Sequence, residues 1–162
     1  MGEPVQLALF DFDGTLIPGD SIALLVRWAR KKRLITAAEF LSALAAAAGY
    51  GLGLVSAKAS KEKALRFLAR RSAGERDRIN RDFARVLLPL VYPKALNCLR
   101  AHRDAGRMTV LVTASTDNYM RPVGEALGFD AVLATPYLPD GALGENCMTA
   151  QRHIVTWVSS VL

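Results

Sequence analysis

The chain has 162 residues, of which 51% are hydrophobic and 22% charged, and its net charge is +6. This length and balance are typical of a soluble globular protein with one domain, or of a small core domain with an inserted cap. The positive charge is spread along predicted helices, and no basic platform with interleaved aromatic residues is present, so we expect no nucleic-acid partner.

The two cysteines, Cys98 and Cys147, lie far apart without a CxxC pattern, so the sequence predicts neither a zinc site nor a disulfide framework. The N-terminus lacks the basic segment of a signal peptide, and we expect a cytoplasmic protein. The uncharged stretch 40–57 approaches the length of a membrane span. It consists largely of Ala, Gly and Ser, which favours a helix ending near Gly49 and a glycine-rich link, with no membrane contact.

Residues 5–10 form a nearly continuous apolar run, which predicts a buried parallel strand. Asp11 and Asp13 follow this strand two residues apart, so both side chains can face one way. In an open α/β sheet, ligands bind beyond the carboxyl ends of the strands. Two acids there suit Mg²⁺ or an aspartyl nucleophile. The alternative is an Asp-rich turn, with Gly14 and Thr15 as turn and cap residues.

Helical spacing and end signals predict five helices after this loop. Thr36 and Glu39 fit a capping box, Pro89 stops one helix, and Gly106 closes another. The predicted helices are 21–33, 36–50, Ser56 or Ser60 to about 71, 75–88 and 93–105.

The second half of the chain alternates strands and helices. The predicted elements are a strand at 108–112, a helix at 118–127 ended by Gly128, a short strand at 131–134, a hairpin around Asp140-Gly141 and a final helix at 154–162. The first two strands are separated by about ninety residues of mostly helix, far more than an ordinary crossover needs. We therefore predict an α/β fold with an all-helical cap inserted after the first strand.

Thr113, Ala114 and Ser115 follow the second predicted strand. A hydroxyl and helix-start amides at the end of a strand form an anion site, which suits a phosphate group. The alternative is that Thr113 only caps the next helix.

The run 10–16, Phe-Asp-Phe-Asp-Gly-Thr-Leu, resembles motif I of the haloacid dehalogenase (HAD) superfamily in its DxDGT phosphatase form. The segment 110–115 resembles motif II. Together with Asp20-Ser21, 127–135 and Asp140-Gly141, these motifs resemble the phosphoserine-phosphatase-like branch, subfamily IB. The resemblance implies a Rossmann-like parallel-sheet core, formed by 1–18 and 92–162 and incomplete, with a helical cap over 19–91.

The same resemblance implies a Mg²⁺-dependent phosphatase that hydrolyses a small-molecule phosphate monoester. In this family Asp11 attacks phosphorus and Asp13 acts as general acid and base, and Mg²⁺ is held at Asp11 and Asp13. The phosphate is then expected at Thr113, Ala114 and Ser115. Asp20 either contacts the polar head of the substrate or caps the helix that follows it.

Two departures from the family pattern accompany this resemblance. The motif III lysine, which neutralises the nucleophile and the phosphate in this family, falls near Arg152. We expect Arg152 to bind the phosphate, with the charge but not the shape of an ammonium group. The acidic pair of motif IV is missing, so we expect a chain that is truncated at its C-terminus. Without the strand that carries motif IV, residues 5–10 would be an exposed edge strand. We expect the protein either to form a homodimer through this edge or to be poorly stable. The alternative function is a catalytically impaired remnant or interaction module; a basic nucleic-acid-binding helical protein is a weaker one.

Overall fold

A three-stranded parallel sheet in the order β1-β2-β3 lies at the centre of the structure, a computed structural model that describes residues 6–145. The strands are β1 (Leu7–Phe10), β2 (Met108–Thr116) and β3 (Ala131–Thr135). Leu7 pairs with Met108 and Phe10 with Leu111, so the residues after β1 lie beside the second half of β2. This α/β sheet confirms the predicted fold class, and its register brings the two predicted motifs to one edge.

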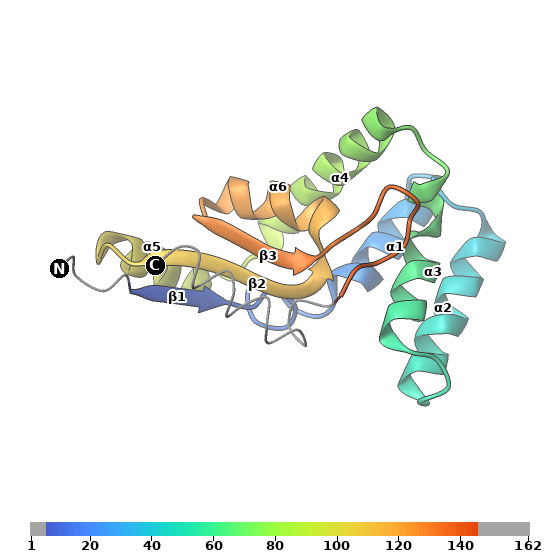
Figure 1. Cartoon of the computed structure of the whole chain (residues 1–162), viewed down its shortest axis with the longest axis horizontal. Coiled ribbons are helices and arrows are strands. Elements are labelled where there is room, and N and C mark those ends of the chain that lie inside the picture. Colours follow the sequence, from blue (N-terminus) through green and yellow to red (C-terminus); the bar gives the residue numbers. More distant parts are fainter. Residues whose placement is uncertain (1–5, 146–162) are drawn as a thin grey trace.

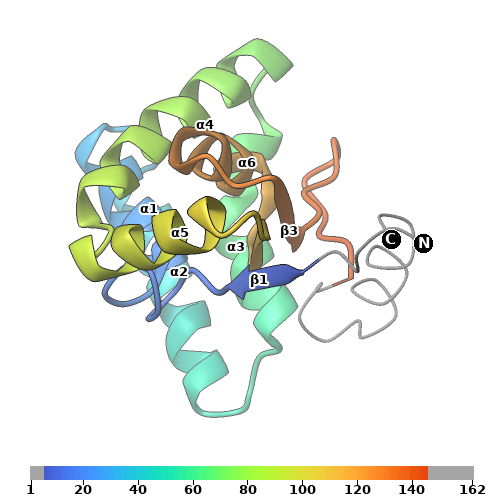
Figure 2. The ribbon, with the colours of Figure 1, turned by 90° about the vertical axis from the view of Figure 1, so that its left-hand side faces the viewer.

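Five α-helices and a short 3₁₀ helix separate β1 from β2, and one further helix separates β2 from β3. They are α1 (Ser21–Lys31), α2 (Ala37–Gly51), α3 (Ala57–Ala69), α4 (Ala73–Leu87), η1 (Leu88–Leu90), α5 (Pro93–Asp104) and α6 (Asp117–Leu127). Figure 1 shows α1, α2 and α3 beyond the ends to which the strand arrows point. In Figure 2, α5 and α6 cover the same side of the sheet.

Local capping sets most of the helix starts. The capping box between Thr36 and Glu39 is present as predicted, with the Glu39 amide 3.2 Å from the Thr36 hydroxyl oxygen. Ser56, not Ser60, caps α3 through the Ala59 amide. A second capping box, from Ser72, starts α4 at Ala73 and not at the predicted residue 75.

Two elements are longer than predicted. Helix α2 continues to Gly51, beyond the predicted end near Gly49, and the turn comes at Gly53, whose φ of +73° suits glycine. Strand β2 continues to Thr116, four residues past its predicted end. Pairing with β3 keeps this extension in the sheet, with a register irregularity between Val112 and Thr116.

One hydrophobic core joins the sheet, the loop after β1 and the helices. Phe12, Leu25, Phe83, Leu111 and Tyr119 are all buried in it, and the Phe83 and Tyr119 rings meet edge to face. Helix α4 also packs against α6. The predicted division into a core of 1–18 and 92–162 and a cap of 19–91 stays a prediction.

Other predictions concern the edges of the molecule. Among the described strands β1 is an edge strand, and Leu9 on it is 53% exposed; the homodimer stays a prediction. The predicted hairpin is a single antiparallel bridge between Tyr137 and Leu143.

The uncharged stretch 40–57 is divided between α2 and α3, and none of the helices within residues 6–145 has the length and apolarity to cross a membrane. The helix predicted at 154–162 lies outside the described residues.

Candidate active site

The loop after β1 presents Asp11 and Asp13 on either side of a buried Phe12. The Phe12 side chain is anchored in the core, and its carbonyl accepts the Leu16 amide at 2.9 Å. Gly14 has φ +75°, and its amide donates to the Gly19 carbonyl at 3.0 Å, which closes the loop. Both acids are therefore held at the carboxyl end of β1, where each is half-buried.

Asp13 is fixed through both of its carboxylate oxygens. The Ser21 amide at the start of α1 donates to Oδ1 at 2.7 Å, and the Ser115 hydroxyl donates to Oδ2 at 2.5 Å. The Ser21 hydroxyl lies 2.8 Å from that of Ser115 and 3.0 Å from that of Tyr119. The site thus contains a buried chain of three hydroxyl groups that ends on Asp13.

The direction of each hydrogen bond among these three hydroxyl groups follows from the fact that each hydroxyl has one proton to donate. Ser115 uses its proton on Asp13, so the Ser21 hydroxyl must donate to Ser115 and the Tyr119 hydroxyl to Ser21. Burial raises the pKa of Tyr119, which keeps its hydroxyl protonated as this order requires. All three hydroxyls therefore orient their dipoles toward the Asp13 carboxylate.

Two opposing effects act on the Asp13 carboxyl group. Burial raises its pKa, and the hydrogen bonds from Ser115 and Ser21 lower it in part; the net direction is upward from 3.8. A carboxyl group with a raised pKa is suited to donating and accepting a proton. Asp11 has a different environment: it is half-buried, and the Thr15 hydroxyl donates to its Oδ2 at 3.1 Å.

Residues 113–115 lie beside this loop, as the β1–β2 register requires. Thr113 is fully buried, and its hydroxyl oxygen accepts the Ser115 amide at 3.1 Å. The Ser115 hydroxyl faces Asp13. The roles of Thr113, Ala114 and Ser115 in phosphate binding stay predictions.

Lys61 is a site residue that the sequence did not reveal. It lies on α3, and its Nζ donates to the Ala114 carbonyl at 2.7 Å. This contact brings a cation from the predicted cap to the predicted phosphate-binding segment. Nothing in the sequence distinguishes Lys61 from Lys58 or Lys63 on the same helix, and Tyr119, on α6, was likewise not identified.

Two further predicted residues have different outcomes. The Asp20 carboxylate accepts the Ala23 amide at 2.9 Å and caps α1, so the capping alternative is confirmed, while its contact with substrate stays a prediction. Arg152 lies outside the described residues.

The oxygen donors at Asp11 and Asp13 fit Mg²⁺, which is commonly bound through one or two carboxylates together with water and substrate phosphate. Because both Asp13 carboxylate oxygens accept hydrogen bonds, the side chain of Asp11 is the better donor. Within residues 6–145 no group of three or more His, Cys, Asp or Glu side chains forms a closed metal site.

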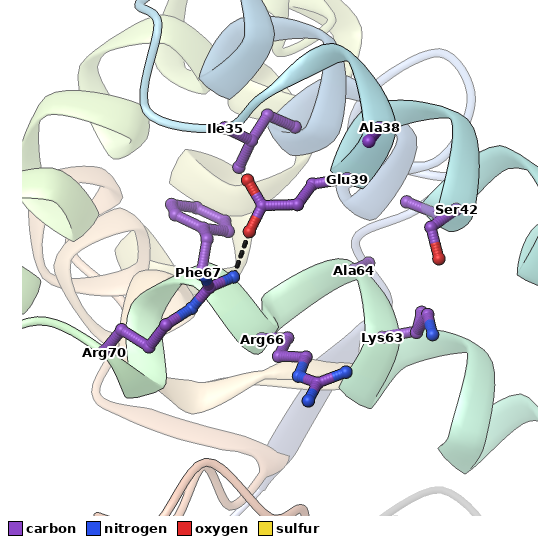
Figure 3. Close-up of a pocket in the computed structure, with 10 residues that line it drawn as sticks. Ile35, Ala38, Glu39, Ser42, Lys63, Ala64, Arg66, Phe67 and Arg70 are labelled. Carbon is purple, nitrogen blue, oxygen red and sulfur yellow. Dashed lines mark hydrogen bonds and ion pairs between the residues drawn. The ribbon is translucent and has the colours of Figure 1, made fainter.

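A cavity lies between α2 and α3, away from the loop that carries Asp11 and Asp13 (Figure 3). Its lining includes Glu39 and Arg70, which form an ion pair, and the basic residues Lys63 and Arg66. None of its described lining residues comes from β1, β2 or the loops that follow them, so it does not belong to the acid pair.

Comparison with known proteins supports the resemblance. The family model for haloacid dehalogenase-like hydrolases matches residues 8–158. Protein CicA of Caulobacter vibrioides is 29% identical over 162 residues, which cover 95% of this chain and 72% of CicA. A histidinol-phosphatase of Neisseria meningitidis is 29% identical over 132 residues, which cover 80% of this chain and 60% of that protein.

The fold is also found in solved structures. A protein of unknown function from Bordetella pertussis Tohama I has a TM-score of 0.85 at 27% identity, over 98% of this chain and 76% of that one. Phosphoserine phosphatases, at 15–19% identity, share the fold.

Proposed function

The chain belongs to the haloacid dehalogenase-like hydrolases, and we propose that it is a phosphatase that cleaves a small phosphate monoester through an aspartyl-phosphate intermediate. The observation that carries the proposal is the pair of acids after β1 in unlike environments. Asp11 has one hydroxyl neighbour, whereas Asp13 is held through both oxygens and has a raised pKa. Two carboxyl groups in environments as different as these are suited to different roles in catalysis.

Asp11 is the nucleophile of the first step. One of its carboxylate oxygens attacks phosphorus, the ester P–O bond breaks, and the leaving alkoxide takes a proton from Asp13. In the second step Asp13 takes a proton from a water molecule, the water oxygen attacks phosphorus, and the bond to Asp11 breaks to release inorganic phosphate. The two steps return both acids to their starting protonation states.

The hydrogen bonds to Asp13 serve both steps. The Ser21 amide and the Ser115 hydroxyl fix the direction of the carboxyl group, so no reorientation is needed at the moment of proton transfer. Burial favours the protonated form that the first step requires.

Charge on the transferred phosphoryl group needs cationic neighbours. We assign this role to Lys61, which the Ala114 carbonyl holds beside the predicted phosphate-binding segment, together with Arg152. Thr113 and the Ala114 amide supply hydrogen bonds to the phosphate oxygens, and the Ser115 amide, which donates to the Thr113 hydroxyl oxygen, fixes the position of that hydroxyl. When bound at Asp11, Mg²⁺ would offset the repulsion between nucleophile and phosphate.

The test is phosphate release from p-nitrophenyl phosphate with Mg²⁺ present and after treatment with EDTA. We expect turnover with Mg²⁺ and its loss with EDTA. Turnover that persists without metal would remove the Mg²⁺ role. No turnover with any divalent metal would favour the impaired remnant or interaction module.

A further inference from the structure

An apolar groove leads away from the acid loop between α1, α2 and α3. Its volume is about 430 Å³, within the range of small-molecule sites. Asp20, Lys61 and Ala114 line its inner end, where the predicted phosphate-binding segment lies. The groove therefore reaches the predicted phosphate-binding segment at Ala114.

The lining of the groove is mostly hydrocarbon. The polar side chains among its described lining residues are Asp20, Arg27, Ser60 and Lys61, and the remaining positions are apolar or Tyr50. The groove exists because alanines from α2 and α3 are too small to fill the space between the three helices.

Helix α2 is incompletely packed for so apolar a sequence. One residue of its fifteen, Ala43, is buried, while Leu44 and Tyr50 on the groove are 45% and 55% exposed. The loop that follows adds Leu52 and Leu54, exposed by 75% and 78%. An apolar groove with a few polar groups at one end is typical of a small-molecule binding site.

We propose that this groove holds the leaving group of the substrate, and that the substrate is an amphiphilic phosphate monoester, the phosphate of an alcohol with an alkyl chain of several carbons. This inference rests on the proposed function. The phosphate lies at the acid loop near Lys61, and the chain runs along α2 toward Tyr50. A leaving group as small and polar as an amino acid would leave most of the groove empty and its apolar walls in water.

Binding of alkylphosphonates tests the groove without any turnover, because their C–P bond is not a phosphate ester. We would titrate the full chain, with Mg²⁺, with methyl-, butyl- and octylphosphonate by calorimetry. A fully buried methylene is worth about fourfold in affinity and a half-buried one about twofold, so octylphosphonate should bind on the order of 100-fold more tightly than methylphosphonate. Equal affinity along the series would overturn the proposal.

Two variants on one helix locate the effect. Ala47 lines the groove and Ala48 does not, although both are exposed on α2. Ala47→Phe should reduce the gain from methyl- to octylphosphonate by about tenfold or more, whereas Ala48→Phe should keep it. An equal loss in both variants would show that the alkyl chain of the ligand does not lie in the groove, and would overturn the assignment of the groove to the leaving group.

Turnover of methyl and octyl phosphate separates this inference from the proposed function. Hydrolysis of both with equal kcat/KM would overturn the groove assignment and leave the phosphatase intact. Hydrolysis of neither, with chain-length-dependent phosphonate binding, would overturn the phosphatase and leave the groove as a binding site for amphiphilic phosphates.

Discussion

Ser115 donates a hydrogen bond to Asp13 across 102 positions of sequence, with its Oγ 2.5 Å from Oδ2. The β1–β2 register makes this contact possible, because it sets the loop after Phe10 beside the end of β2. The contact orients the carboxyl group that we propose as general acid and base.

Substitution Ser115→Ala removes a donor that lowers the pKa of Asp13, so this pKa should rise further. Asp13 must be protonated in order to donate a proton to the leaving alkoxide, and activity therefore falls as the pH rises through the pKa of Asp13. We expect the alkaline limb of kcat/KM for an alkyl phosphate to move to higher pH, with a loss of about tenfold from poorer orientation. Ser42→Ala on α2 is the control, and a limb that stays in place or moves to lower pH would contradict the role of Ser115.

Substitution Asp13→Asn should stabilise the fold at neutral pH. Because the pKa of Asp13 is raised on folding, its contribution to stability is fully present below the unfolded value of 3.8 and is lost as the pH rises through the folded pKa. Asparagine stays neutral throughout. The variant should therefore exceed the wild type in Tm by about 2–4 °C near neutral pH, and by less near about pH 4.

The measurement is thermal unfolding by calorimetry in metal-free buffer. Asp77→Asn, at an exposed position on α4, controls for the change in net charge. A Tm difference that is constant with pH, or that grows toward low pH, would show that burial does not dominate at Asp13.

Substitution Asp11→Asn should abolish turnover of p-nitrophenyl phosphate, because an amide does not attack phosphorus. We expect a loss of at least about 10³-fold in kcat, as for other nucleophile replacements. Asp104→Asn, at the exposed end of α5, should retain full activity. Full activity in Asp11→Asn would remove the nucleophile assignment.

Substitution Lys61→Met should lower kcat/KM for phosphate esters by about 10- to 100-fold, because a cation beside the phosphate site is lost. Lys63→Met is a matched control two positions along α3, where the side chain is exposed and lines the separate cavity of Figure 3. The measurement is steady-state kinetics of both variants. Similar losses of kcat/KM in the two would show that Lys61 acts only through the overall positive charge of the protein and not at the phosphate site.

The acid loop was predictable because its information is local. A strand, two acids and a glycine at fixed spacing specify the turn whatever the rest of the chain does, and the Thr36–Glu39 capping box is local in the same way. The end of β2 was not predictable from local signals. Its last residues stay extended because β3 lies beside them, and β3 is formed by residues after α6.

The sequence by itself predicted most of the helices and strands, because capping and periodicity signals are local, and its motifs predicted the acid pair and the family through a resemblance. Only the tertiary structure decided that Tyr119, Ser21 and Ser115 form one hydroxyl chain, that Lys61 rather than Lys58 or Lys63 reaches Ala114, and that small side chains on three helices leave a groove. The reason is physical: hydrogen bonds and cavities depend on distances between segments far apart in the chain, and packing sets those distances.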